Sequence, residues 1–331
     1  MKLQILVPQY KETDSVIKPL LDSILIQRNV DFKDIGVIIT NDGTDVKLSK
    51  EFLDSYPFEI KYIQAEHKGV SGARNVCLDN ATADYIMFCD ADDCFFSSIS
   101  VENILATIDR LHFDAFQSTF LEEAIDPRNG AHVYIKREHA HVFVHGKIYR
   151  LQYIKDLGLR WEERLSYHED GYFNAIALMS CRADKYVYCT EPFYLWCWNA
   201  SSVCRSDPYF IVKTYDQDIL AQDLILDRIK DYNRPAAMDL FLTQLYQTFF
   251  LVTGSHSKVV TLKNYFDMID DMTADLYLKY IDLWKDISDE QKKQKDTVCR
   301  NLAKNQQYLI EKPDYTIDKW LKDIVEKKKR A

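Results

Sequence analysis

The stretch DYIMFCDADD, residues 84–93, carries the clearest signal for the class of fold. Its apolar half shows no alternation of polar and apolar residues, which is typical of a strand that is buried on both faces of a parallel sheet. Three carboxylates follow directly, although a carboxylate requires water, a cation or a partner. Because ligands of open parallel sheets bind beyond the carboxyl ends of the strands, these acids mark a candidate ligand site.

The rest of the first hundred residues has the same organisation. Strands are expected at 3–8, 35–42, 59–65 and 84–91, and helices at 13–27, 71–81 and 98–111. This alternation predicts an α/β fold, with a mostly parallel sheet and helices on both of its faces.

The chain beyond residue 112 changes character twice. Further strands are expected at 114–120, 131–138, 139–150 and 185–198, and a helix at 169–180. After about residue 207 glycine nearly disappears and amphipathic helical stretches follow one another. We therefore expect a first domain over 1–207, with halves at 1–112 and 113–207, and an all-α C-terminal domain over 208–331.

Composition excludes several classes of protein. Hydrophobic residues make up 47% of the chain, which is enough for a large core, and the net charge of −9 argues against a nucleic-acid-binding protein. No segment approaches the roughly 20 apolar residues that span a bilayer. The eight cysteines form no C-x-x-C pair, and we expect them to be reduced in a cytoplasmic protein.

Asp90 and Asp92 form a pair that suits a divalent cation. In an extended chain residues i and i+2 point the same way, so both carboxylates would face one object. Without a cation they would repel each other, and the pKa of one would rise. Oxygen ligands of this kind select Mg²⁺, Mn²⁺ or Ca²⁺. The alternative is an acidic loop that caps the next helix, since Ser97 and Ser98 follow.

Two other strand ends carry polar groups. Asp42 closes the strand IGVIITND, although the sequence DGT is also typical of an ordinary turn. The first strand ends in VPQYKE, which supplies Pro8, Tyr10 and Glu12. Three neighbouring strand ends with such groups predict a pocket for one nucleotide-sized ligand.

The loop HKGVSGARN, residues 67–75, adds groups that suit a diphosphate. It contains Lys68, an open backbone at Gly72 and Arg74 at the start of a helix. Helix N-termini and cationic side chains both favour phosphate groups. The loop is not a Walker A sequence, and taken alone it is weak evidence.

These motifs together resemble a known family. VPQYKE, NDGT, GVSGARN, YIMFCDADD and HEDGYF stand in the order and at the approximate spacing of family 2 glycosyltransferases with the GT-A fold. The similarity covers roughly residues 1–205 and departs from the family at Lys11, where asparagine is usual, and at Asn41, where aspartate is common. The resemblance implies a Rossmann-like sheet and a nucleotide-sugar donor, most often a UDP-sugar.

The resemblance also implies roles for single residues. Asp42 would contact the uracil edge, and Arg74 would lie near the nucleotide or the diphosphate. Asp90, Ala91 and Asp92 would form the D-x-D motif, in which Asp90 reaches the ribose or metal-bound water and Asp92 ligates Mn²⁺ or Mg²⁺. The nucleotide-sugar-binding residues expected in this way are Pro8, Tyr10, Glu12, Asp42, Lys68, Gly72, Arg74, Asp90, Ala91, Asp92 and Arg205.

The stretch SYHEDGYF, residues 166–173, supplies a candidate general base. Ser166 and Glu169 match a capping box, so a purely structural role is one explanation. In the family that the chain resembles, the base falls on the aspartate of this E-D pair, here Asp170. Glu169 would either orient the acceptor or hold a cationic residue of a loop. A base on the face opposite the leaving group implies inversion at the anomeric carbon.

Three histidines fall on the strand expected at 139–150. His139, His141 and His145 have the same parity and would share one face of that strand. At about 3.3 Å per residue the span is too long for all three to bind one zinc ion, so no zinc site is expected. The resemblance implies that His145-Gly146-Lys147 forms the sheet edge beneath the acceptor.

The sequence therefore predicts a metal-dependent, inverting glycosyltransferase of glycan or polysaccharide biosynthesis. Its acceptor hydroxyl would belong to a glycan, a lipid-linked molecule or a protein, and no nucleic acid partner is expected. The alternative is a catalytically silent module that binds a nucleotide sugar or a glycan with the same fold, against which the intact Asp92 and Asp170 argue. A sugar-nucleotide pyrophosphorylase would need a glycine-rich loop after the first strand, and VPQYKE contains no glycine.

The C-terminal region leaves further partners open. Its amphipathic helices would pack on the first domain, form a homo-oligomer or bind the acceptor's carrier. The chain ends in EKKKRA, residues 326–331, which suits either peripheral contact with the inner surface of a membrane or a plain soluble terminus.

Overall fold

The computed structural model describes every residue except 201, 203–206, 208–209, 256–262, 306–315 and 331. The chain divides into two compact units, Met1–Ser202 and Val203–Ala331. The domain boundary expected at 207 falls a few residues beyond this division.

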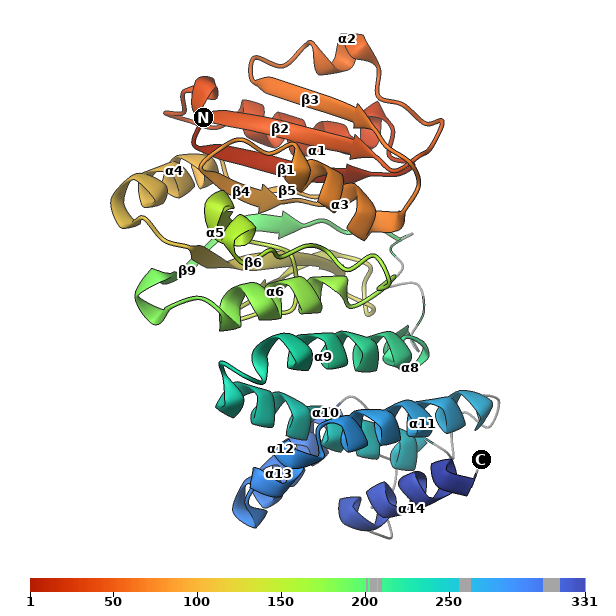
Figure 1. Ribbon diagram of the computed structural model, residues 1–331. Helices are drawn as coiled ribbons and strands as arrows, with labels where there is room; N and C mark the ends of the chain where they lie inside the picture. Colours follow the sequence, from red (N-terminus) through yellow and green to blue (C-terminus); the bar gives the residue numbers. More distant parts are fainter. Residues whose placement is uncertain (201, 203–206, 208–209, 256–262, 306–315, 331) are drawn as a thin grey trace. The chain divides into compact units, whose positions relative to one another are not determined.

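A nine-stranded mixed sheet forms the centre of the first unit, counted over the described residues (Figure 1). Its strands are β1 (Leu3–Gln9), β2 (Ile35–Asn41), β3 (Glu59–Gln64), β4 (Tyr85–Phe88), β5 (Cys94–Phe95), β6 (Ala115–Ile125), β7 (His132–Arg137), β8 (Lys147–Arg150) and β9 (Tyr186–Trp196). They lie in the order β3-β2-β1-β4-β8-β6-β9-β5, and β7 pairs with β6. The first four strands run parallel to one another, so their carboxyl ends meet at one edge, as the sequence predicts.

Helices cover both faces of this sheet, which confirms the expected α/β layering (Figure 1). They are α1 (Asp14–Leu25), α2 (Lys50–Leu53), α3 (Gly69–Asp79), α4 (Ser100–Leu111), α5 (Leu151–Asp156) and α6 (Glu169–Met179), with 3₁₀ turns at Phe32–Asp34 and Ala183–Lys185. Apolar residues of α1 and α4 share one buried cluster with alternate residues of β1. On the opposite face the ring of Phe88 in β4 contacts the rings of Trp161 and Phe173, the latter in α6.

One predicted strand is largely wrong. Of the stretch 139–150 only Lys147–Arg150 forms a strand, and the residues before it are irregular. His139 has φ 50° and Gly146 has φ 67°, and both values interrupt an extended chain. A Cβ at Gly146 would stand 2.6 Å from Ser118 Oγ, so glycine permits this close approach. The shared face expected for three histidines therefore does not exist.

The second unit is helical, as expected. Its helices are α8 (Phe210–Lys213), α9 (Tyr215–Ile229), α10 (Arg234–Ser255), α11 (Lys263–Lys279), α12 (Ile281–Asp286), α13 (Asp289–Asn305) and α14 (Ile317–Arg330). Large apolar side chains of α10, such as Phe241 and Phe250, are fully buried in its core. Within the described part of the chain, no helix combines the length and apolarity needed to cross a membrane.

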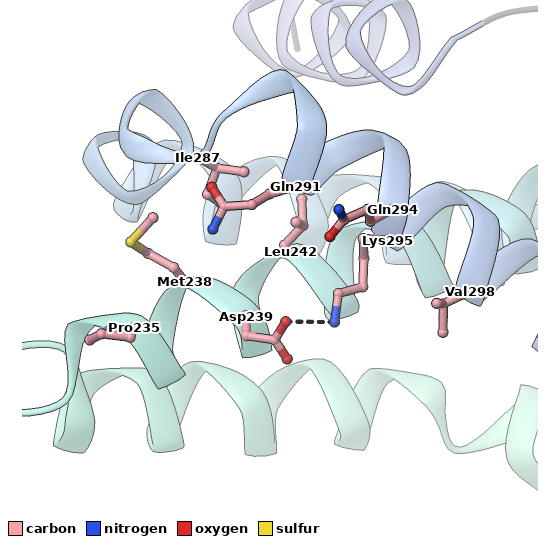
Figure 2. Close-up of a pocket in the computed structure, with 9 residues that line it drawn as sticks. All are labelled: Pro235, Met238, Asp239, Leu242, Ile287, Gln291, Gln294, Lys295 and Val298. Carbon is pink, nitrogen blue, oxygen red and sulfur yellow. Dashed lines mark ion pairs between the residues drawn. The ribbon is translucent and has the colours of Figure 1, made fainter.

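A hollow of about 310 Å³ lies beside α10 and α13 in this second unit (Figure 2). Met238 and Leu242 line it from α10, and an ion pair of 2.7 Å between Asp239 and Lys295 bridges the two helices. None of the residues expected to bind the nucleotide sugar lines this hollow.

Candidate active site

Asp42 ties the end of β2 to the start of α3. Its carboxylate is buried, with Oδ1 accepting a 2.8 Å hydrogen bond from the backbone N–H of Lys68 and Oδ2 lying 2.8 Å from His67 Nδ1. Gly43 makes this approach possible, because its φ is 71° and a Cβ there would stand 2.4 Å from the backbone nitrogen of His67. Asp42 therefore has a fixed orientation at the carboxyl edge of the sheet.

Tyr10 and His67 form an exposed stacked pair beside Asp42. Their ring centroids are 5.0 Å apart and their planes differ by 22°. Glu12 folds back beneath this end of β1, where its Oε2 accepts hydrogen bonds of 2.7 and 3.2 Å from the backbone N–H groups of Tyr10 and Lys11. Flat rings beside a buried carboxylate offer both stacking and hydrogen bonding to a planar base.

Sequence reasoning missed His67. The residue stands directly before Lys68 in HKGVSGARN, and an aromatic ring next to this phosphate-type loop was the available signal. Its contact with Asp42 joins positions 25 residues apart, which local patterns do not reveal.

Arg74 lies at the centre of the site and is only 3% exposed. Its Nη1 donates to Glu169 Oε1 at 3.0 Å and to Asp170 Oδ1 at 2.8 Å, and its Nη2 donates to Asp90 Oδ1 at 2.9 Å. The guanidinium also lies 4.4 Å from the ring centroid of Trp161. One cation therefore joins the D-x-D motif to the E-D pair, which the sequence indicated as separate elements.

The carboxyl groups around Arg74 differ in protonation. Burial, together with the charge of the neighbouring Asp170, raises the pKa of Glu169 to about 8, although Arg74 opposes both effects. Burial alone would raise the pKa of Asp90 as well, but the guanidinium outweighs it and holds that pKa below its ordinary value. At neutral pH Glu169 therefore carries a proton, and Asp90 is ionised.

Glu169→Gln should remove one source of pH-dependent stability. Because the folded state raises the pKa of Glu169 from 4.5 to about 8, it retains a proton that the unfolded chain releases, and this contribution to stability is lost as the pH rises across that interval. The melting temperature of Glu169→Gln relative to wild type should therefore rise between pH 5 and pH 8, by the equivalent of roughly 1 kcal/mol or more.

Thermal unfolding at several pH values tests this expectation, with Glu59→Gln as the control on the exposed edge of β3. A melting temperature of Glu169→Gln that runs parallel to wild type across this range would contradict the raised pKa.

The acidic stretch after β4 is a turn and not an extended chain. The backbone N–H of Asp93 donates to the carbonyl of Asp90 at 3.2 Å. Asp92 points to Asn199, whose Nδ2 donates to Asp92 Oδ2 at 2.7 Å. The expected alignment of Asp90 with Asp92 on an extended chain is therefore wrong, and their assignment to a metal stays a prediction.

Asp93 supports this turn from within. It is 1% exposed, and its carboxylate accepts hydrogen bonds from the Tyr194 hydroxyl and from the backbone N–H of Cys197. Burial, together with the charges of Asp90 and Asp92, raises the pKa of Asp93 well above its ordinary value. Such crowding of carboxyl groups is what a nearby cation would relieve.

One group of three metal-type ligands stands at this turn among the described residues. Ligand atoms of Asp90, Asp93 and His145 all lie within 4.8 Å of one another. His145 is 4% exposed, its Nδ1 has no hydrogen-bond partner, and burial lowers its pKa to about 4, so the ring is neutral. Two carboxylates and a neutral imidazole fit a divalent cation.

The remaining expected residues are placed as follows. Pro8 pairs with Thr40 across β1 and β2, so it lies at the same carboxyl edge as Asp42. A Cβ at Gly72 would stand 2.4 Å from Lys68 Cβ, so only glycine fits there without movement. Ala91 is buried within the acidic turn. Arg205 lies outside the described residues.

A model of the family described as "Glycosyl transferase family 2" matches residues 4–173, just over half of the chain. The chain belongs to this family. The resemblance stated from its motifs is thereby confirmed.

Curated relatives of this family 2 chain are named glycosyltransferases. Glycosyltransferase GlyA of Streptococcus pneumoniae is 37% identical over 95 residues, which are 28% of this chain and 13% of GlyA. Poly(ribitol-phosphate) beta-N-acetylglucosaminyltransferase TarS of Staphylococcus aureus is 24% identical over 250 residues, covering 68% of this chain and 41% of TarS. The chain thus spans well under two thirds of either relative.

Solved structures of TarS share the fold. Residues 1–349 of S. aureus TarS in complex with UDP align over 100% of this chain and 92% of that chain, with 17% identity and a TM-score of 0.65. The complex of the same protein with UDP-GlcNAc gives 18% identity, the same coverage and a TM-score of 0.64. The expected GT-A sheet followed by a helical region is therefore confirmed.

Proposed function

We propose that this family 2 chain transfers a sugar from a UDP-sugar to an acceptor hydroxyl with inversion at the anomeric carbon. The contact that carries the proposal is the buried Arg74, which joins Asp90 of the D-x-D motif to Glu169 and Asp170. A donor-side motif and a candidate base are thus held by one side chain. TarS has been crystallised with UDP and with UDP-GlcNAc, which makes UDP-GlcNAc the first donor to test.

The donor's base would bind at the edge formed by β1 and β2. Tyr10 and His67 supply exposed rings, and the fixed carboxylate of Asp42 supplies hydrogen-bond acceptors. The diphosphate would then extend toward Lys68 at the start of α3, where backbone amides and a cation favour it.

Asp92 and Asp90 would hold Mn²⁺ or Mg²⁺, with Asp93 and His145 behind them. When bound, the ion would supply Lewis-acid stabilisation of the departing diphosphate, an effect worth several kcal/mol. Burial raises the pKa of Asp92, while Asn199 opposes this rise by donating a hydrogen bond to the charged form. Asn199 therefore keeps Asp92 oriented and more readily ionised.

Asp170 would act as the general base. Its Oδ1 is held by Arg74 and its Oδ2 accepts a 3.0 Å hydrogen bond from the backbone N–H of Val144, while the side chain remains 24% exposed. An acceptor hydroxyl would attack the anomeric carbon, the bond from that carbon to the diphosphate oxygen would break, and the hydroxyl proton would pass to Asp170. Such proton transfer is typically worth about 10²- to 10⁴-fold in rate.

The acceptor is proposed from the names of the relatives. TarS acts on poly(ribitol phosphate), and GgaB of Bacillus subtilis, 36% identical over 88 residues, is named for minor teichoic acid biosynthesis. A glycan polymer that contains phosphate is therefore the first acceptor class to test, with a lipid-linked or protein acceptor as the alternatives.

Donor hydrolysis is the most direct test of this proposal. Release of UDP from UDP-GlcNAc is expected in the presence of Mn²⁺, and both EDTA and Asp92→Ala should lower it by at least about tenfold, because the leaving diphosphate loses its stabilisation. Isothermal titration with Mn²⁺ and UDP gives a second reading of the same site. Turnover that EDTA leaves unchanged would contradict the proposed dependence on a divalent cation. Tight binding of UDP without turnover of any nucleotide sugar would favour the catalytically silent binding module.

A further inference from the structure

The peptide group between Phe143 and Val144 is held at both ends. Its N–H donates to Asp170 Oδ2 at 3.0 Å. Its carbonyl accepts hydrogen bonds from Lys147 Nζ and, at 2.9 Å, from Asn174 Nδ2. The backbone N–H that binds the candidate base is therefore held in place by two side chains, which bind the carbonyl of the same peptide group.

Lys147 is an unusual partner for a backbone carbonyl. It belongs to β8, is 1% exposed, and its Nζ also donates to the carbonyl of Ala140 at 2.9 Å. Burial lowers the pKa of Lys147 to about 7, and the described hydrogen bonds of Nζ are with these two carbonyls, to which both the amine and the ammonium can donate. Both carbonyls belong to the irregular segment before β8, so the lysine stabilises residues that lie outside any strand.

Asn174, in α6, forms hydrogen bonds to the same segment. It is 1% exposed, and its Nδ2 donates to the carbonyls of Val142 and Phe143 at 3.1 and 2.9 Å. Its Oδ1 accepts a 2.8 Å hydrogen bond from the Tyr149 hydroxyl, so the amide cannot rotate freely. Helix α6 also carries Asp170. The position of the base and the position of the backbone N–H that binds it are therefore both set by this helix.

We infer that Lys147 is a positioning residue for Asp170, acting through the Phe143–Val144 peptide group. This inference rests on the proposed role of Asp170 as the base. The hydrogen bond from Lys147 Nζ to the Phe143 carbonyl polarises the peptide group, so that the N–H of Val144 becomes a stronger donor to Asp170 Oδ2. With Arg74 on Oδ1, this N–H fixes the plane of the carboxylate, and a misplacement of about 1 Å at a reacting group costs on the order of 10²-fold in rate.

Lys147→Met removes the N–H donors at Nζ but keeps an unbranched apolar side chain of similar length. Its turnover number for the donor that the wild type hydrolyses should fall by about 10- to 100-fold, while the affinity for UDP stays within about twofold. Lys147→Gln keeps N–H donors without the charge and should lie between Lys147→Met and wild type. Lys155→Met, the same change on an exposed face of α5, is the control and should match wild type.

A double-mutant cycle with Asp170→Asn separates positioning from a general effect on the fold. In the Asp170→Asn background Lys147→Met should change the residual rate by less than about twofold, because the base through which it acts is already absent. An equal loss in both backgrounds, or a loss of UDP binding in Lys147→Met, would overturn the inference. Full activity of Asp170→Asn alone would instead contradict the proposed base.

Discussion

Asp170→Asn is expected to lower the transfer rate by about 10²- to 10⁴-fold and to leave the affinity for UDP nearly unchanged. Asparagine cannot accept the proton of the acceptor hydroxyl. Its amide group would also turn an N–H toward Arg74 Nη1 or toward the backbone N–H of Val144, and both of these groups are donors. The substitution therefore removes the base and disturbs its orientation at once.

Two measurements test this expectation. Turnover of the donor with and without acceptor reports the chemical step, and titration with UDP reports the donor site. Asp156→Asn, at the exposed end of α5, makes the same chemical change away from the site and should match wild type. Transfer at the full wild-type rate by Asp170→Asn would assign the base to another group.

The parallel half of the sheet could be predicted because its signals are local. Strands β1, β2 and β4 are mostly apolar, with polar or acidic residues at or shortly after their carboxyl ends, and the carboxyl ends of parallel strands must meet at one edge. Asp42 and Asp90 were placed at that edge by this argument alone. Neither needed knowledge of a distant contact.

The segment before β8 could not be predicted in the same way. Its apolar residues Val142, Phe143 and Val144 are typical of a strand. The carbonyls of Ala140, Val142 and Phe143, however, accept hydrogen bonds from the side chains of Lys147 and Asn174. A side chain that replaces a strand as the hydrogen-bond partner leaves no periodic signal in the sequence. The apolar run within 139–145 was therefore misleading.

The position of Arg74 was also beyond local reasoning. Its partners Glu169 and Asp170 lie 95 and 96 residues further along the chain. One signal was present, because Arg74 shares α3 with Ala73 and Cys77, and an arginine among small buried residues requires buried acids. The sequence indicated a cation near the site. It did not indicate that the guanidinium of Arg74 pairs with carboxyl groups of the protein itself.

Arg74→Met is expected to destabilise the first unit by about 3–5 kcal/mol at neutral pH. The substitution leaves the partly buried carboxylates of Asp90 and Asp170 without their shared cation. In the wild type Arg74 lowers the pKa of Asp90, and stability from a lowered carboxyl pKa is present above the ordinary pKa and lost as the pH falls. The difference between wild type and Arg74→Met should therefore shrink as the pH is lowered below about 4.

Urea unfolding at neutral and acidic pH measures both parts of this expectation, and the chain offers a matched control. Arg160 also pairs with a carboxylate, that of Asp79, but the two side chains are 48% and 55% exposed. Arg160→Met should therefore cost about 0–1 kcal/mol at neutral pH, because water already screens that pair. If Arg74→Met lost no more stability than Arg160→Met, the three carboxyl groups would not depend on Arg74, and the link between the donor motif and the base would have to be made by other groups.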